Sequence, residues 1–491
     1  MRRAAIVLAA AGLAAALCAL PVHGQDAPAP ESRATLRAAL ERLVAAAPWG
    51  DRRRDEAQVG IEVLDLASGE VVYARHADRP LNPASNAKLL VMAAALEALG
   101  PAFTIPATLH GVRDGDAVAG DIVLRGRGDP TLTAEDLWEL ARAARATGIT
   151  RVRGGIRIDD SYFDDERLPY AYDSQPNEDA AFRAPVGAAS IDANAVEVWI
   201  GPGAAPGDPA RFFAYPEEFL ETKLEARTVA GAGNALRMFA SAGDDGATRV
   251  RIWGSIGVVA PWAAYPRRID DPVRFAGLAL REALRAAGIA VEGAGVAAGP
   301  VPEGATELAR HESEPLHAWL WRLGKESSNF HAEQLLRILG AERKGTPGTA
   351  ARGAEVVRET LEAWNVPTDG LVLRNGSGLF AADEVAPRTL AALLRAVYLD
   401  VEIRPEFLAA LAVAGRDGTL RSRLETPALR GRIRAKTGTL AAVWALSGYV
   451  LSPDGRAGYA FSVLVNDPCR RRDVARALQD DLAVALAADL D

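Results

Sequence analysis

The chain has 491 residues, of which 49% are hydrophobic and 24% charged, and its net charge at pH 7 is −8. This length exceeds what one hydrophobic core ordinarily supports, so we expect a soluble globular protein of two or three domains. The acidic balance argues against nucleic acid as a partner.

A secretory leader is predicted at residues 1–24, where two arginines precede an apolar stretch and small residues precede Gln25. The predicted mature chain is periplasmic, with a net charge of −10 because the leader carries two arginines and no acid. No later segment has the length and apolarity of a retained membrane anchor, so none is expected after cleavage. Cys469 is the only mature cysteine, which excludes an intrachain disulfide and a cysteine-rich zinc site.

The first elements of the mature chain are predicted from their periodicity. Residues 32–47 carry apolar side chains at helical spacing and predict an amphipathic helix. Strand-like runs over 59–66 and 71–74 flank a glycine-containing turn and predict a β-hairpin. The run from Leu89 to Leu99 is apolar on nearly every face, which predicts a buried helix.

Ser85 lies three residues before Lys88 at the start of that buried helix, so both side chains belong to one face. Burying a lysine is costly unless its ammonium is paired or loses its proton. On its own, Ser-x-x-Lys is a weak pattern that favours a serine N-cap followed by a lysine that extends to the surface. However, the chain has five lysines against 51 arginines. Because arginine cannot give up its proton, catalytic lysines should be enriched among those five.

The middle of the chain has a different sequence pattern from its two ends. Residues 104–305 alternate strand-like pieces with Gly, Pro and Asp turns, which predicts β-rich inserted domains. Helical patterns return from His311, and three strand-like segments and a helix close the chain. The simplest architecture is a multidomain α+β protein in which residues 25–103 and 306–491 form one helix-and-sheet domain around the insertion.

Two further motifs follow the insertion. Ser327 and Asn329 form Ser-x-Asn in a predicted loop, and a Lys-Thr-Gly-Thr run begins with Lys436 at a strand end. Alone, the first is typical of a helix cap and the second of an exposed strand next to a turn. Together with the Ser-x-x-Lys at Ser85, in this order, they form the signature of penicillin-binding proteins and serine β-lactamases.

Four longer stretches narrow the resemblance: LRGRGDPTL from Leu124, APVGAASIDANAV from Ala184, NGSGL from Asn375 and AGRDGTL from Ala414. Over nearly the whole mature chain the sequence resembles the low-molecular-mass class C penicillin-binding proteins. These are D-alanyl-D-alanine carboxypeptidase/endopeptidases of the DacB type, peptidase family S13. The resemblance implies a serine β-lactamase/DD-peptidase-like domain, an antiparallel sheet flanked by helices, with domains II and III inserted between the first two motifs. It also implies peptidoglycan stem peptides as substrates and β-lactam antibiotics as inhibitors, with no cofactor and no metal.

The residue types suggest how such chemistry would run. A serine hydroxyl needs a base, and Lys88 can serve Ser85 if burial and the cation of Lys436 lower its pKa. Ser327 can pass the proton to the departing nitrogen, and Asn329 can donate to a substrate amide. No mature histidine lies in a recognisable triad motif, and His331 is interpreted first as a helix-face residue.

The last motif would bind the end of the substrate. Lys436, Thr437 and Thr439 can hold the terminal carboxylate of D-Ala-D-Ala. The backbone N–H groups of Ser85 and Thr439 would meet the oxyanion. Gly438 is expected to keep the strand edge open to the substrate backbone.

The sequence departs from the family after NGSGL, where Phe380, Ala381 and Ala382 precede Asp383 instead of Ser-Arg-x-Asn. The lost arginine leaves recognition of the acidic side chain of the stem peptide unsupported. An alternative function is therefore a catalytically weak peptidoglycan-binding or β-lactam-sensing protein. A β-lactamase is disfavoured by the large insertion and by the lack of a recognisable deacylating glutamate motif. The choice between carboxypeptidase and endopeptidase stays open.

Overall fold

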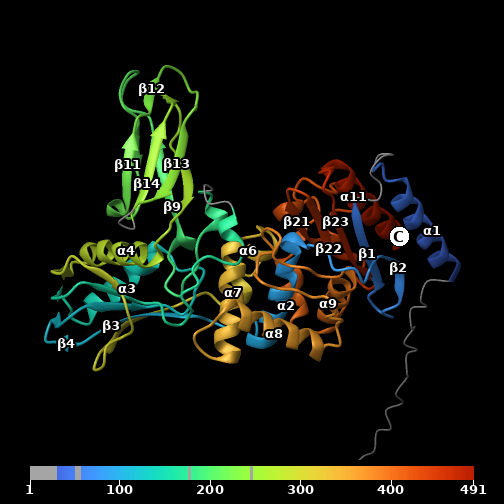
Figure 1. Cartoon of the computed structure of the whole chain (residues 1–491), viewed down its shortest axis with the longest axis horizontal. Helices are drawn as coiled ribbons and strands as arrows, with labels where there is room; N and C mark the ends of the chain where they lie inside the picture. Colours follow the sequence, from blue (N-terminus) through green and yellow to red (C-terminus); the bar gives the residue numbers. More distant parts are fainter. Residues whose placement is uncertain (1–29, 50–56, 175–178, 244–246) are drawn as a thin grey trace, which may run out of the picture.

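The computed structural model describes residues 30–49, 57–174, 179–243 and 247–491. The predicted leader and the cleavage site before Gln25 lie outside these residues. Figure 1 shows a helix-and-sheet part at one end of the molecule and, at the other, a part built from the middle of the chain. Helix α7 (Asn329–Lys344) stands between the two. None of the helices in the described ranges combines the length and the apolarity needed to cross a bilayer.

A six-stranded sheet with the order β2-β1-β23-β22-β21-β20 organises the helix-and-sheet part. Its strands are β1 (Gln58–Asp65), β2 (Val71–Arg75), β20 (Ala412–Val413), β21 (Ile433–Leu440), β22 (Val443–Leu451) and β23 (Gly458–Asn466). All neighbouring strands are antiparallel, and β1 pairs with β23 along its whole length. The expected hairpin and antiparallel sheet are therefore confirmed, and the two ends of the chain share one sheet.

Both faces of this sheet are covered. On one face lie α1 (Pro30–Ala46) and α11 (Arg472–Ala488), which contact each other. Phe461 and Val463 of β23 belong to the core under these helices, whereas Ala460 and Leu464 belong to the core on the opposite face. This alternation follows from the period of two along a strand.

On the opposite face α2 (Ala87–Leu99) occupies the centre, where it contacts α7 and most of the helices around it. The surrounding helices are α5 (Leu316–Trp319), α6 (Trp321–Gly324), α8 (Ala350–Ala363), α9 (Pro387–Leu399) and α10 (Arg404–Ala410). Every residue of α2 from Ala87 to Leu96 is buried. The prediction of a buried helix from a sequence that is apolar all round is confirmed.

The middle of the chain first forms two small sheets, with the orders β18-β8-β6-β3-β19 and β17-β7-β5-β4. The first contains β3 (Pro106–Gly111), β6 (Ile122–Arg125), β8 (Ile156–Asp159), β18 (Val296–Ala298) and β19 (Thr306–Glu312). The second contains β4 (Arg113–Asp114), β5 (Ala117–Val118), β7 (Arg151–Val152) and β17 (Ala290–Val291). Because β19 pairs with β3, the insertion's sheet extends past the boundary predicted at residue 305, and the rest of the predicted division stays a prediction.

Two amphipathic helices also belong to the insertion, which was predicted only to be β-rich. Both α3 (Ala134–Ala146) and α4 (Pro272–Ala286) pack their apolar faces into one core with the two sheets. Their start signals are present in the sequence: Thr133 caps α3 in a capping box, and Asp271 caps α4 ahead of a proline.

A narrow group of strands projects from the insertion at the upper left of Figure 1. It contains β9 (Ala195–Gly201), β10 (Arg211–Phe213), β11 (Leu220–Leu224), β12 (Arg227–Val229), β13 (Arg237–Ala242), β14 (Thr248–Trp253), β15 (Ser255–Gly257) and β16 (Ala263–Arg268). These strands form three small sheets, β10-β9-β16, β11-β14-β13 and β12-β15. They enclose a small core of their own around Val198, Val250 and Ile252.

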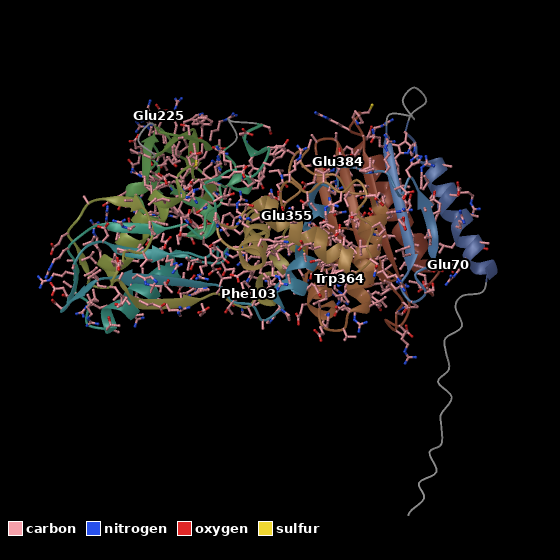
Figure 2. All side chains as sticks on the ribbon, turned by 60° about the horizontal axis from the view of Figure 1, so that its bottom comes forward. Glu70, Phe103, Glu225, Glu355, Trp364 and Glu384 are labelled. Atoms are coloured by element: carbon pink, nitrogen blue, oxygen red, sulfur yellow. The ribbon has the colours of Figure 1, made fainter. Side chains whose placement is uncertain are left out.

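The chain leaves and re-enters the helix-and-sheet part at one place. Phe103, labelled in Figure 2, lies where the two parts meet. Its carbonyl accepts a hydrogen bond from the Leu316 N–H at 2.8 Å, and the Pro101 carbonyl accepts one from the His317 N–H at 3.0 Å. The two crossing segments are therefore joined to each other by backbone hydrogen bonds.

Candidate active site

Ser85 lies in a single 3-10 turn (Ala84–Asn86) that leads directly into α2. Asn82 anchors this turn, since its Oδ1 accepts from the Ala84 N–H at 2.8 Å and its N–H donates to Asn466 of β23 at 2.9 Å. Asn86 donates to Ser447 of β22 at 2.9 Å. The helix N-cap is Asn86, so the interpretation of Ser85 as an ordinary N-cap is wrong. The turn holds Ser85 rigidly against the sheet.

Lys88 has no exposed surface, so its side chain does not extend to the solvent. Its Nζ lies 3.0 Å from Ser85 Oγ, 2.8 Å from Asn329 Oδ1 and 2.6 Å from the Ser377 carbonyl oxygen. Burial lowers the pKa of Lys88 to about 7, against the opposing effect of the Glu333 and Asp383 carboxylates. A neutral amine here donates to Asn329 and Ser377 and accepts the proton of Ser85.

Ser327 and Asn329 lie on either side of Ser328, the N-cap of α7. The Ser328 N–H donates to the Arg322 carbonyl at 2.8 Å, and Ser327 takes a left-handed φ of 63°. This backbone turns Ser327 Oγ toward Lys436 Nζ, at 2.8 Å, while Asn329 Oδ1 accepts from Lys88. The predicted loop therefore links the two lysines of the site.

Lys436 is buried on β21, where its Nζ also donates to the Thr437 carbonyl at 2.8 Å. Burial lowers its pKa well below the usual range, and the charge of Lys88 lowers it further. The charge of Lys88 thus acts on Lys436, whereas the expectation was that the Lys436 cation lowers the pKa of Lys88. Burial is the cause of the low pKa of Lys88, and Lys436 is not among its causes.

Beyond Ala435 the outer edge of β21 has no strand partner in the described part of the chain, because β20 pairs with Arg434 and Ala435 alone. Thr437 Oγ1 hydrogen-bonds Thr419 at 2.8 Å, and Thr439 is exposed on the same strand. This edge offers backbone groups to an added strand. All eight predicted site residues therefore lie on three adjoining segments: the turn and first residues of α2, the loop and first residue of α7, and β21.

Gly438 also lets two parts of the protein approach closely, besides its predicted role of leaving the strand edge open to the substrate backbone. A side chain added there would lie 2.8 Å from the Pro83 carbonyl oxygen and 3.0 Å from Ala84 Cβ. The absent side chain therefore allows β21 to approach the turn that carries Ser85. The close approach is made by the protein's own backbone.

Most of the chain also matches a known protein family. The family model of the D-Ala-D-Ala carboxypeptidase 3 (S13) family matches residues 44–489. The chain belongs to this family. The expectation of a DacB-like class C penicillin-binding protein, a serine-type hydrolase, is thereby confirmed.

Relatives of this S13 peptidase agree with that assignment. It is 36% identical to a D-alanyl-D-alanine carboxypeptidase of Actinomadura sp. (strain R39) over 447 residues, covering 87% of this chain and 81% of the relative. It is 24% identical to D-alanyl-D-alanine carboxypeptidase DacB of Haemophilus influenzae, covering 83% and 85%. The crystal structure of penicillin-binding protein 4 from H. influenzae shares its fold, with a TM-score of 0.73, 22% identity and coverage of 91% and 98%.

Two buried carboxylates of this S13 peptidase were missed by the motif analysis. Glu333, one turn after Asn329 on α7, accepts from the N–H groups of Gly376 and Ser377 at 3.0 and 2.9 Å. Asp383 accepts from the backbone of Arg374 and Asn375, and burial raises its pKa to about 7. The helical spacing of Asn329 and Glu333 was an available signal. Through these bonds the carboxylates hold the NGSG segment, whose Ser377 carbonyl accepts from Lys88.

The departures from the family pattern surround this segment without touching the catalytic groups. Phe380 packs edge-on against Tyr172 with ring centroids 6.1 Å apart, and the Arg183 guanidinium lies 5.5 Å from the ring centroid of Phe380. The Phe380 carbonyl accepts from Asn82 at 2.9 Å. Phe380 therefore helps to anchor the turn of Ser85.

His331 is a buried core residue, as its helix-face interpretation predicted. Its Nδ1 shares a hydrogen bond with Ser328 Oγ at 2.8 Å, and its ring contacts Trp319 and Phe330. Burial lowers its pKa to about 3, so the imidazole is neutral at physiological pH. Lys88, not this histidine, is the base within reach of Ser85.

Proposed function

We propose that this chain is a periplasmic serine D-alanyl-D-alanine carboxypeptidase/endopeptidase that cleaves peptidoglycan stem peptides through an acyl-enzyme on Ser85 and is inhibited by β-lactams. The observation that carries the proposal is the fully buried Lys88, with its Nζ 3.0 Å from Ser85 Oγ and a pKa of about 7. The family supports the reaction class. The predicted leader supports the periplasmic location.

The reaction begins when neutral Lys88 takes the proton of Ser85 and Ser85 Oγ attacks the carbonyl carbon of the penultimate D-alanine. The N–H groups of Ser85 and Thr439 receive the oxyanion. Removing one such donor typically costs about 3–4 kcal/mol of barrier. Ser327, whose Oγ lies 2.8 Å from Lys436 Nζ, then passes the proton taken up by Lys88 on to the leaving nitrogen. The peptide bond breaks, D-alanine departs, and water then hydrolyses the ester on Ser85.

The substrate is held by the edge of β21. Lys436 and the hydroxyls of Thr437 and Thr439 bind the terminal carboxylate, while Asn329 donates to a substrate amide. Asn329 Nδ2 donates one of its two hydrogens to the Phe182 carbonyl at 3.1 Å, which leaves the second for the substrate. No cofactor enters the scheme. Inhibition by β-lactams is supported by a second H. influenzae structure, which is described as complexed with a novel β-lactam.

The proposal is tested by the intact mass of the mature protein after incubation with benzylpenicillin, with peptide mapping of the adduct. We expect one persistent adduct on Ser85, and release of D-alanine from a stem pentapeptide. The Ser85→Ala variant is the control and should show neither. Binding of the pentapeptide without D-alanine release would favour the binding or sensing alternative. Consumption of the drug without a lasting adduct would indicate a β-lactamase.

Acylation should rise with pH through about 7, because burial lowers the pKa of Lys88 to about 7 and only the neutral amine can act as base. Below this pH the ammonium dominates and the rate falls. Replacing Glu333 by Gln removes a charge that favours the ammonium, so the acid limb should move to lower pH. The measurement is the benzylpenicillin acylation rate from pH 5 to 9. An acid limb that stays in place in Glu333→Gln would assign the titration to another group.

A further inference from the structure

Three potential metal ligands meet in the insertion, apart from the catalytic groups. Asp136 and Glu139 are three residues apart on α3, and His311 lies on the facing strand β19. One ligand atom from each of the three lies within 4.8 Å of the others. The ligands come from segments far apart in the sequence, so no motif analysis could have joined them.

The imidazole of His311 and one carboxylate oxygen of Asp136 are left without hydrogen-bond partners among the described residues. Among the described residues the imidazole of His311 has no hydrogen-bond partner: its Nδ1 lies 3.7 Å from Asp136 Oδ1, and its Nε2 lies 4.0 Å from Asp129 Oδ2. Both distances exceed hydrogen-bonding range. Asp136 accepts the Thr133 N–H and hydroxyl through Oδ2 alone, which leaves Oδ1 toward the histidine.

Asp129 supplies a second, independent observation. Its side chain is 2% exposed, and its Oδ1 accepts from the N–H and hydroxyl of Thr131 at 2.8 and 2.7 Å. Its Oδ2 is buried with no hydrogen-bond partner in the described ranges, and it faces His311 Nε2. A buried, unpaired carboxylate oxygen is costly unless a cation or a donor reaches it.

We propose that Asp136, Glu139 and His311 bind one Zn²⁺ ion, with Nδ1 of His311 as the nitrogen ligand and water in the fourth position. A set of one imidazole and two carboxylates suits a divalent transition metal, whereas Mg²⁺ and Ca²⁺ prefer oxygen ligands alone. Asp129 is then a positioning residue. It receives the Nε2–H of His311 and so directs the lone pair of Nδ1 to the metal.

The geometry needs only small side-chain movements to reach this state. Zinc ligands lie about 2.0–2.2 Å from the ion, so tetrahedral ligand atoms end roughly 3.3–3.6 Å apart. Glu139 is exposed on α3 and free to rotate toward the ion, and His311 would move closer to Asp129. The bound ion would join α3 to β19 and so stabilise the insertion. This site is independent of the proposed peptidase reaction.

The experiment is calorimetric titration of the untagged, metal-stripped mature chain with ZnCl₂. Three variants are compared with the wild type: Glu139→Gln, His311→Gln and Asp129→Asn. The matched control is His317→Gln, an exposed histidine that contacts the Pro101 carbonyl. The melting temperature of each metal-free variant reports its folding. The melting temperature with Zn²⁺ added reports stabilisation by the ion.

We expect one Zn²⁺ per chain at micromolar concentration, and a higher melting temperature with the ion. Glu139→Gln and His311→Gln should each weaken Zn²⁺ binding at least about tenfold. Asp129→Asn should also weaken it about tenfold, because Asp129 orients the imidazole of His311, while the melting temperature of this variant without metal stays that of the wild type. His317→Gln should bind as the wild type does. Absence of Zn²⁺ binding, or binding unchanged in Glu139→Gln and His311→Gln, would overturn the proposal. Equal affinity for Mg²⁺ would also overturn it, because it would show a plain acidic cluster.

Discussion

Replacing Lys88 by Met should lower the rate constant for acylation by benzylpenicillin by roughly a thousandfold, the scale expected for loss of a general base. Ser85 remains in place, since its turn is anchored by Asn82 and Asn86 rather than by the lysine. The melting temperature should change little, because methionine has a similar length and the removal of a costly buried amine offsets the loss of its hydrogen bonds to Asn329 and Ser377. Stopped-flow acylation and differential scanning calorimetry measure the two quantities.

The matched control is Lys344→Met, at the exposed end of α7, where the ammonium pairs with Glu359 at 2.5 Å. It removes a lysine without touching the site, so acylation should be unaffected. Near-normal acylation in Lys88→Met would show that another group activates Ser85. A large fall in melting temperature would instead show that Lys88 is mainly structural, and the loss of rate would then carry no mechanistic weight.

The Gly378→Ala variant should lose stability and activity together. Gly378 has a φ of 74°, and an added Cβ would lie 1.8 Å from the Ala84 carbonyl oxygen, a backbone atom that cannot simply rotate away. Left-handed strain and overpacking together suggest a loss of about 2–5 kcal/mol in the free energy of unfolding. Relief of the clash displaces the turn of Ser85, and a misplacement of about 1 Å costs on the order of a hundredfold in rate.

Gly455→Ala separates backbone strain from the clash. Gly455 has a φ of 71° in the turn between β22 and β23, and nothing lies within 4 Å of an added Cβ. This variant should lose about 1–2 kcal/mol of stability and keep normal acylation. Urea denaturation and the acylation rate distinguish the two glycines. Equal effects in both variants would mean that the contact between the NGSG segment and the nucleophile turn is not tight.

The sequence could indicate the proposed catalytic residues because their chemistry limits the choice of side chain. Lys88 and Lys436 are fully buried, whereas Lys223 and Lys344 are exposed and Lys325 pairs with Asp417. The scarcity of lysine in an arginine-rich chain therefore indicated Lys88 and Lys436, the two buried positions where the proposed chemistry needs a side chain that can lose its proton. The helix after Ser85 was predictable for a similar reason, since a sequence that is apolar all round can only be buried.

The supporting carboxylates could not be predicted in the same way. Asp383 contacts backbone eight and nine residues before it, and Glu333 contacts backbone more than 40 residues after it. Backbone N–H groups carry no side-chain signature, so a sequence does not show which carboxylate will bind them. The lowering of the pKa of Lys88 by burial likewise depends on how tightly α2 is enclosed.

The pairing of β1 with β23 has a consequence for folding kinetics. The bond between Asn82 and Asn466 closes a loop of 384 residues, and contacts of such sequence separation slow the search for the native state. The insertion shortens this search if it folds first, because the Phe103 carbonyl and the Leu316 N–H are already joined at its ends. A folded insertion then acts as a short link in the loop that remains to be closed. The order in which the two parts fold therefore sets how long the strand edges of the large sheet stay exposed to aggregation.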